Sequence, residues 1–223
     1  MSRVIPLFPL PLVLFPRAVQ PLHIFEQRYR ELLSDCLAGD KEFGVICRPS
    51  GVNEEDLEVG SVGCVAHVES TQPLGDGRSN IMVMGTDRFA FLGFAAADTL
   101  YRSARVEPVT DVPATPDVVE PLAREVRDVF LRAGRAARTM QDDGTPLPEL
   151  PDDPSQLSFA VAQYVDLELA ERQRLLSSRS AEERLRMLAT TLAPLISNLE
   201  RGADVHERAR TNGHGHGPLT GDA

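Results

Sequence analysis

Few residues in this chain could serve as nucleophiles or general bases. Lys41 is the only lysine, and it stands between Asp40 and Glu42 rather than in the glycine-rich turn of a phosphate-binding loop. A Walker A loop, a Ser–Lys nucleophile pair and a Schiff base would each depend on this one residue. No Gly-x-Ser-x-Gly pattern marks a nucleophile elbow. The sequence therefore predicts no catalytic residue, no cofactor and no enzymatic activity.

Potential metal ligands are equally sparse. His214 and His216 flank a single glycine, and two histidines supply neither four ligands nor a fixed geometry. Cys36, Cys47 and Cys64 are odd in number and lack CxxC spacing. This pattern favours reduced, buried thiols over a disulfide framework. We therefore expect no metal site and a cytoplasmic location, where thiols stay reduced.

The balance of charge argues against two classes of partner. The 223 residues carry 23 basic and 33 acidic side chains, for a formal net charge of −10. Nucleic-acid binding normally requires a basic surplus, because lysine and arginine replace the counterions of the phosphates. Anionic membrane surfaces attract basic segments in the same way. The longest proline-free apolar run near the N-terminus, Leu12 to Phe15, is also too short for a signal sequence or a membrane span. Neither nucleic acid nor a membrane is expected as a partner.

Three zones that must position any site follow one another along the chain. Residues 1–112 are rich in β-branched, aromatic and glycine residues, and their alternation predicts about six short strands. Residues 113–200 carry helical periodicity, and residues 201–223 form a polar tail that has little to bury. The sequence therefore predicts an α+β fold: a small closed or half-closed β-barrel with one inserted helix, then a bundle of three or four helices, then a disordered tail. The inserted helix shows six apolar residues at helical spacing: Phe25, Tyr29, Leu32, Leu33, Cys36 and Leu37.

An acidic, proline-rich segment at 142–153 separates two of the predicted helices. It could lie over the arginine-bearing helix that precedes it, or it could be a plain linker. Asp153, Pro154, Ser155 and Gln156 then have the residue types of a capping box with proline in the first turn. A helix is therefore predicted to begin at Pro154.

Two charged residues, Glu26 and Arg88, each stand beside aromatic residues that are expected in the core. We predict that they form a buried or half-buried ion pair with a structural role. Removing one partner of such a pair destabilises a protein by more than the pair itself contributes, because the other charge is left without compensation.

Taken in order, the motifs of this chain resemble the N-terminal domain of Lon proteases. In that family this region is a PUA-like pseudo-barrel followed by a helical bundle, it recognises protein substrates, and ATPase and Ser–Lys protease modules follow it. The resemblance covers residues 1 to about 200, and it implies a stand-alone substrate-binding domain without those modules. The matching motifs are VIPLFPL at 4–10, VLFP at 13–16, PLHIFE at 21–26 with RY at 28–29, FGV at 43–45, VG at 59–60 and again at 62–63, DGR at 76–78, Gly85 with RF at 88–89, Gln173 with LL at 175–176, and ERL at 183–185.

The resemblance implies a bacterial protein that binds unfolded or partly folded proteins or peptides without hydrolysing them. It would act as an adaptor of an ATP-dependent protease or as a binder of unfolded chains. Exposed apolar patches are the physical basis for gripping such segments. Leu10, Leu12 and Val13 lie in a proline-rich segment that could present such a patch, and they are the candidate substrate-binding residues. Burial in the core is nevertheless the simpler explanation for most of them.

Two further functions stay open at this point. PUA-like barrels elsewhere bind RNA, so a module that binds RNA or a small ligand is the alternative, although the net charge of −10 weighs against RNA. The third candidate is a hydrolase whose catalytic residues come together only in the folded chain, because catalytic triads are assembled in space rather than in sequence. The protein-binding function is the one that the residues and the resemblance favour together.

Overall fold

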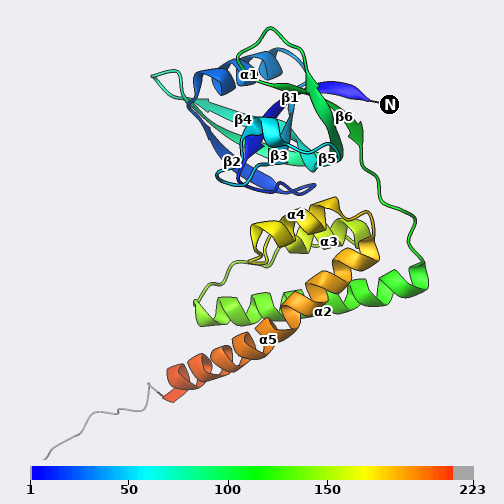
Figure 1. Ribbon diagram of the computed structural model, residues 1–223. Helices are drawn as coiled ribbons and strands as arrows, with labels where there is room; N and C mark the ends of the chain where they lie inside the picture. The colour runs from blue at the N-terminus through cyan, green and yellow to red at the C-terminus, as the bar shows by residue number, and fades with distance from the viewer. Residues whose placement is uncertain (1, 213–223) are drawn as a thin grey trace, which may run out of the picture.

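The computed structural model describes residues 2–212 and places a β-barrel at one end and a helical bundle at the other (Figure 1). Six strands form one sheet in the order β2-β5-β4-β3-β1-β6, and β5 also pairs with β6, which closes the sheet on itself. Only β1 and β3 run parallel. The strands are β1 (Arg3–Leu10), β2 (Val19–Ile24), β3 (Glu42–Cys47), β4 (Val62–Pro73), β5 (Ser79–Ala95) and β6 (Ser103–Pro108).

Closure of the sheet depends on the length of β5. It pairs with β2 over Ser79–Met84, with β4 over Ser79–Ala90 and with β6 over Phe89–Ala95. A register shift between Phe91 and Gly93 marks the second half, and such irregularities bend a strand. Gly85 allows the loop after β1 to pass close by, because a Cβ at this position would lie 2.2 Å from the backbone oxygen of Phe15. β2 pairs with β5 alone among residues 2–212, so its other edge is open.

Helix α1 (Gln27–Ala38) packs against the barrel, as the sequence predicts, but with a narrower apolar face. Tyr29, Leu32 and Leu33 are buried in the core. Phe25 precedes the helix and is 59% exposed, and Leu37 is 40% exposed, so the expectation that these two residues face the core is wrong. A short 3-10 helix, η1 (Glu54–Asp56), lies between β3 and β4.

The bundle consists of α2 (Pro116–Met140), α3 (Pro154–Ala162), α4 (Leu169–Ser177) and α5 (Ala181–Asn212). Helix α3 begins where its residues predict, since the Asp153 side chain accepts a hydrogen bond of 2.8 Å from the Gln156 backbone N–H. Helix α5 crosses α2 and continues beyond it (Figure 1). It runs through Asn212, so helix replaces the predicted disordered tail at 201–212. The rest of that predicted tail, 213–223, lies outside the described residues, as do His214 and His216.

The two halves predicted to divide at residue 112 share one hydrophobic core. A continuous cluster runs from one face of the strands through α1 into the bundle. Its members include Phe15 from the loop after β1 and Phe159 from α3, whose rings lie 5.9 Å apart. A smaller second cluster is built by strand residues, among them Phe89 and Phe91. In residues 2–212 no helix is both long and apolar enough for a membrane span.

Arg88 does not pair with Glu26, so that prediction is wrong. The Glu26 carboxylate instead accepts a hydrogen bond of 3.0 Å from Arg28. Arg88, which is 6% exposed, contacts Asp111 in the connection between β6 and α2. Arg184 of α5, which is fully buried, donates to the same carboxylate at 2.9 Å. One carboxylate therefore bridges two buried guanidinium groups, one from the barrel and one from the bundle.

Neutral hydrogen-bond acceptors complete the junction between barrel and bundle that Asp111, Arg88 and Arg184 form. Arg88 donates to the carbonyl oxygens of Leu176 and Ser178 at 2.8 and 2.6 Å, and Arg184 donates to the Ser158 hydroxyl at 2.8 Å. Burial acts to raise the pKa of the Asp111 carboxyl, but the hydrogen bonds from its neighbours and the two guanidinium charges outweigh it and hold the pKa below its usual value. The junction fixes how the barrel sits on the bundle.

Candidate functional site

A largely apolar groove with a volume of about 330 Å³ lies in the bundle. Two walls are α2 and α5, and a third is the connection between α3 and α4. The fourth is the segment 141–153 between α2 and α3, which contains no helix or strand and is called the strap below. The apolar residues lining the groove are Phe130, Ala133, Gly134, Ala137, Leu147, Pro148, Tyr164, Val165, Leu192, Leu195 and Leu199.

Several of these apolar side chains face water. Tyr164 is 56% exposed and Leu195 is 41% exposed, although both lie beside buried core residues. The Tyr164 ring lies 5.8 Å from the ring of Phe130, which is 8% exposed and forms part of the floor. Exposed aromatic and aliphatic side chains gathered around a hollow are typical of protein-binding surfaces. The groove can bind apolar side chains without any catalytic chemistry.

Gly134 on α2 determines the depth of the groove at the strap. A Cβ on this residue would lie 2.7 Å from Cδ2 of Leu147, so the leucine side chain occupies the space that a larger residue would fill. Leu147 and the adjacent Pro148 are only half-buried. The position of Leu147 over Gly134 is called the Gly134 seat below.

Arginines of α2 hold the strap near its two ends. Arg127 donates hydrogen bonds of 3.1 and 2.6 Å to the carbonyl oxygens of Leu150 and Pro151. Arg138 donates to the carbonyl oxygen of Thr145. The acidic segment therefore lies over the arginine-bearing helix, which was one of the two alternatives that the sequence left open.

The strap is acidic and carries no basic residue. The backbone N–H of Thr145 donates 2.9 Å to the Asp143 carboxylate, and this hydrogen bond lowers the pKa of Asp143. Asp152 forms a 3.5 Å ion pair with Arg127. Glu149 is exposed and has no ion pair within residues 2–212. The acidic side chains of the strap therefore lie beside basic residues of α2, and Asp143 and Arg138 both line the groove. The acidic residues of the strap are Asp142, Asp143, Glu149, Asp152 and Asp153.

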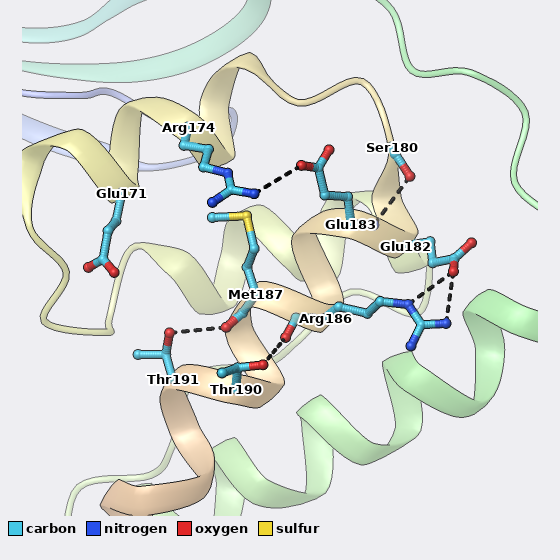
Figure 2. A pocket seen from close by; sticks show the side chains of 9 residues that line it. All are labelled: Glu171, Arg174, Ser180, Glu182, Glu183, Arg186, Met187, Thr190 and Thr191. Atoms are coloured by element: carbon cyan, nitrogen blue, oxygen red, sulfur yellow. Dashed lines mark hydrogen bonds and ion pairs between the residues drawn. The ribbon is translucent and has the colours of Figure 1, made fainter.

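A second hollow, on the outer face of α4 and α5, is polar (Figure 2). Arg174 and Glu183 point toward one another across it and form a 3.6 Å ion pair, and Arg186 pairs with Glu182 at 2.9 Å (Figure 2). Exposed pairs of this kind contribute little. Because these charges already compensate one another, this surface is a weaker candidate for binding than the apolar groove.

The three residues predicted to bind substrate lie away from the groove lining. Leu10 and Leu12 are half-buried and pack against the main core, and Val13 is 4% exposed within that core. The same segment continues into Phe15, over which the Arg172 guanidinium of α4 lies at 5.0 Å. This segment therefore joins the barrel to the helices, and Val13 offers almost no surface to a client.

A smaller apolar patch lies on the outer face of the sheet near the open edge of β2. Val19 is 55% exposed, and Met82 on β5 is 37% exposed. Met84 pairs with Val19 across the strands and is half-buried. Met82 and Met84 thus lie at least partly on the surface. A hollow of about 320 Å³ adjoins this patch, but half of the side chains that line it are polar: Pro21, Leu22, His23, Ser70, Gln72, Asn80, Ile81 and Met82.

Sequence reasoning missed the groove because its residues come from four separate segments. Leu147 and Gly134 are 13 positions apart, and no periodicity predicts that they meet. The usable signal was the pair of apolar residues, Leu147 and Pro148, inside an otherwise acidic segment. Residues 2–212 contain no group of three metal-binding side chains.

A closed barrel with one inserted helix, joined to a helical bundle that carries an exposed apolar groove, defines a two-part α+β domain. The fold matches the crystal structure of a Lon N-terminal domain protein from Xanthomonas campestris, with a TM-score of 0.61, 25% identity, and coverage of 84% of this chain and 98% of that chain. It also matches the N-terminal domain of a Mycobacterium avium complex Lon protease, with a TM-score of 0.64, 21% identity, and coverage of 86% and 98%.

The family follows from the sequence comparison. Residues 4–193 match the family described as the ATP-dependent protease La (LON) substrate-binding domain, and the chain belongs to this family. Among curated relatives, Lon protease 2 of Herpetosiphon aurantiacus is 28% identical over 190 residues, which is 84% of this chain and 23% of that protein. Lon protease of Anaeromyxobacter dehalogenans is 27% identical over 193 residues, with coverage of 85% and 23%. The chain thus spans about a quarter of the length of these relatives.

Proposed function

We propose that this protein is a non-catalytic binder of unfolded or partly folded protein segments, and that it holds their apolar side chains in the groove of the bundle. The observation that carries the proposal is the exposure of Tyr164 and Leu195 beside a hollow lined by α2, α5 and the strap. Membership of a substrate-binding family supports it. We further propose that the chain works in the cytoplasm, alone or as an adaptor of an ATP-dependent protease.

The size of the groove implies weak and reversible capture. A volume of about 330 Å³ accommodates only one or two side chains, and burying one leucine or phenylalanine stabilises a complex by about 1.5–3 kcal/mol. Association also costs several kcal/mol of lost motion. Single segments therefore bind weakly, and a client with several apolar segments is retained longer because it rebinds before it diffuses away. Such behaviour suits a domain that samples clients and passes them on.

The surroundings of the nucleophilic side chains support a role without hydrolysis. Lys41 is exposed on the turn between α1 and β3, where its backbone adopts a positive φ of 62°. Burial raises the pKa of the Cys36 and Cys64 thiols to about 12, so neither is a thiolate at neutral pH. These side chains are explained by turn geometry and core packing alone.

The test compares two exposed leucines that differ only in their place on the molecule. Leu195 lies in the groove, whereas Leu100 is 56% exposed on the barrel. Binding of a fluorescently labelled, permanently unfolded polypeptide is measured by anisotropy for the wild type, Leu195→Arg and Leu100→Arg. We expect Leu195→Arg to weaken binding at least about tenfold, because a charge cannot be desolvated in an apolar site without compensation. Leu100→Arg should leave binding unchanged. Equal binding by both variants would exclude the groove as the client site.

A further inference from the structure

The strap itself places an apolar side chain in the groove. Leu147 lies in the Gly134 seat, where its Cδ2 is 2.7 Å from the position of a Cβ on Gly134. It is flanked by Pro146 and Pro148, which restrict the backbone on both sides. The leucine lies between two prolines and its side chain is held in an apolar hollow. In both respects the strap resembles a bound peptide segment.

We propose that Leu147 is an internal competitor: it occupies the seat that the apolar side chain of a client takes, and the client must displace the strap to bind. This inference rests on the proposed function of the groove and adds its regulation. The free protein then shields the deepest part of its apolar groove from water. It opens that part only when a client side chain replaces the leucine.

The contacts of the strap permit such an exchange. Its backbone is fastened near the two ends, by Arg138 at Thr145 and by Arg127 at Leu150 and Pro151. Between these anchors Leu147 is half-buried, and the strap belongs to no helix or strand. Segments with few buried contacts open locally at a much lower free energy than the core. Leu147 can therefore leave the seat while the ends of the strap remain attached.

The charge of the strap defines the chemistry of the client that fits. Five acidic residues and no basic residue lie between positions 141 and 153. Two acidic side chains, Asp143 and Asp166, and one basic side chain, Arg138, line the groove, and exposed Glu149 follows Pro148 directly in the strap. The preferred client is therefore an extended segment with a branched aliphatic side chain flanked by arginine or lysine. Basic flanks are attracted to the acidic strap, and acidic flanks are repelled by it.

The experiment uses the full chain and a defined probe, a labelled glycine–serine peptide that carries one central leucine between two arginines. Affinities are measured for the wild type, Leu147→Ala, Gly134→Ala and the double variant, with Leu100→Ala as the matched leucine truncation outside the groove. We expect Leu147→Ala to bind the probe about tenfold more tightly. Removing an internal competitor raises the fraction of protein molecules in which the Gly134 seat is free to bind. Leu100→Ala should have no effect. In the double variant the gain should disappear, because the new Cβ at position 134 fills the seat.

Hydrogen exchange supplies a second readout. If Leu147 had only a structural role, binding of the probe would not change the exchange rates of the strap amides. The probe should increase exchange of the backbone amides of Leu147, Glu149 and Leu150 in the wild type, since the client displaces this part of the strap. A version of the probe with glutamates in place of the arginines should bind more weakly. Unchanged or weaker binding by Leu147→Ala, or greater protection of the strap on binding, would overturn the competitor while leaving the groove as the client site. If no folded variant binds the probe and Leu195→Arg is also without effect on unfolded polypeptide, both proposals fail.

Discussion

Replacing Asp111 by asparagine should cost this protein a large part of its stability. The carboxylate lies between the guanidinium groups of Arg88 and Arg184, which are 6% and 0% exposed. Asparagine keeps the shape and one acceptor oxygen, but it leaves two buried positive charges with only neutral carbonyl and hydroxyl acceptors. Removing one partner of a buried ionic group typically costs about 3–5 kcal/mol. Because the Asp111 side chain is 20% exposed and partly screened by water, we expect about 3 kcal/mol.

Urea unfolding followed by circular dichroism measures this loss. With a slope of about 2 kcal/mol per molar urea, a loss of 3 kcal/mol lowers the midpoint by about 1.5 M. Glu182→Gln is the matched control, because Glu182 pairs with Arg186 on the surface at 2.9 Å, and exposed pairs contribute about 0–1 kcal/mol. A loss below about 1 kcal/mol for Asp111→Asn, or equal losses for both variants, would refute the argument that the junction depends on this charge.

Three further predictions follow from the structure. Asp111 also predicts a pH dependence: its folded-state pKa is lowered, so its stabilisation is complete above the unfolded-state value of 3.8 and is lost as the pH falls through the folded-state pKa. Acid titration of the unfolding midpoint should show this loss in the wild type and a smaller one in Asp111→Asn. Gly85→Ala should destabilise the barrel by about 1–3 kcal/mol, because its Cβ would meet a backbone oxygen at 2.2 Å. Gly75→Ala is the control: its Cβ has open space, so urea unfolding should show almost no change in the free energy of unfolding. In native protein a thiol reagent at neutral pH should modify half-buried Cys47 before Cys64, whose pKa burial raises to about 12, and reversal of that order would contradict the burial argument.

Local signals in the sequence were sufficient for the individual elements. The alternation at 62–68 predicted β4, and Asp153 with Pro154 predicted the start of α3, because strand period and helix capping are set by neighbouring residues. The motif resemblance then supplied the arrangement of barrel and bundle. The end of α5 was missed, since the polar composition after residue 200 gave no apolar stripe to predict a helix.

Long-range contacts account for what the sequence could not predict. Arg88 lies in the core, as expected, but its partner Asp111 is 23 residues away in a connection that shows no pattern of its own. The groove likewise depends on the approach of Leu147 to Gly134, which tertiary packing alone determines. Val13 was a candidate for binding because its segment is rich in prolines, yet its side chain is buried in the main core, which the local sequence does not reveal.

The open edge of β2 has a consequence for the proposed binding of unfolded chains. Extended segments held at high local concentration add readily to unpaired sheet edges, and repeated addition is how insoluble fibrils grow. Pro21 stands in the middle of β2 and has no N–H to donate, so an incoming strand finds its ladder of hydrogen bonds interrupted halfway. The sheet is therefore a poor template for unfolded chains. Under the proposed function, a captured segment would be held by its side chains and released without having become part of the fold.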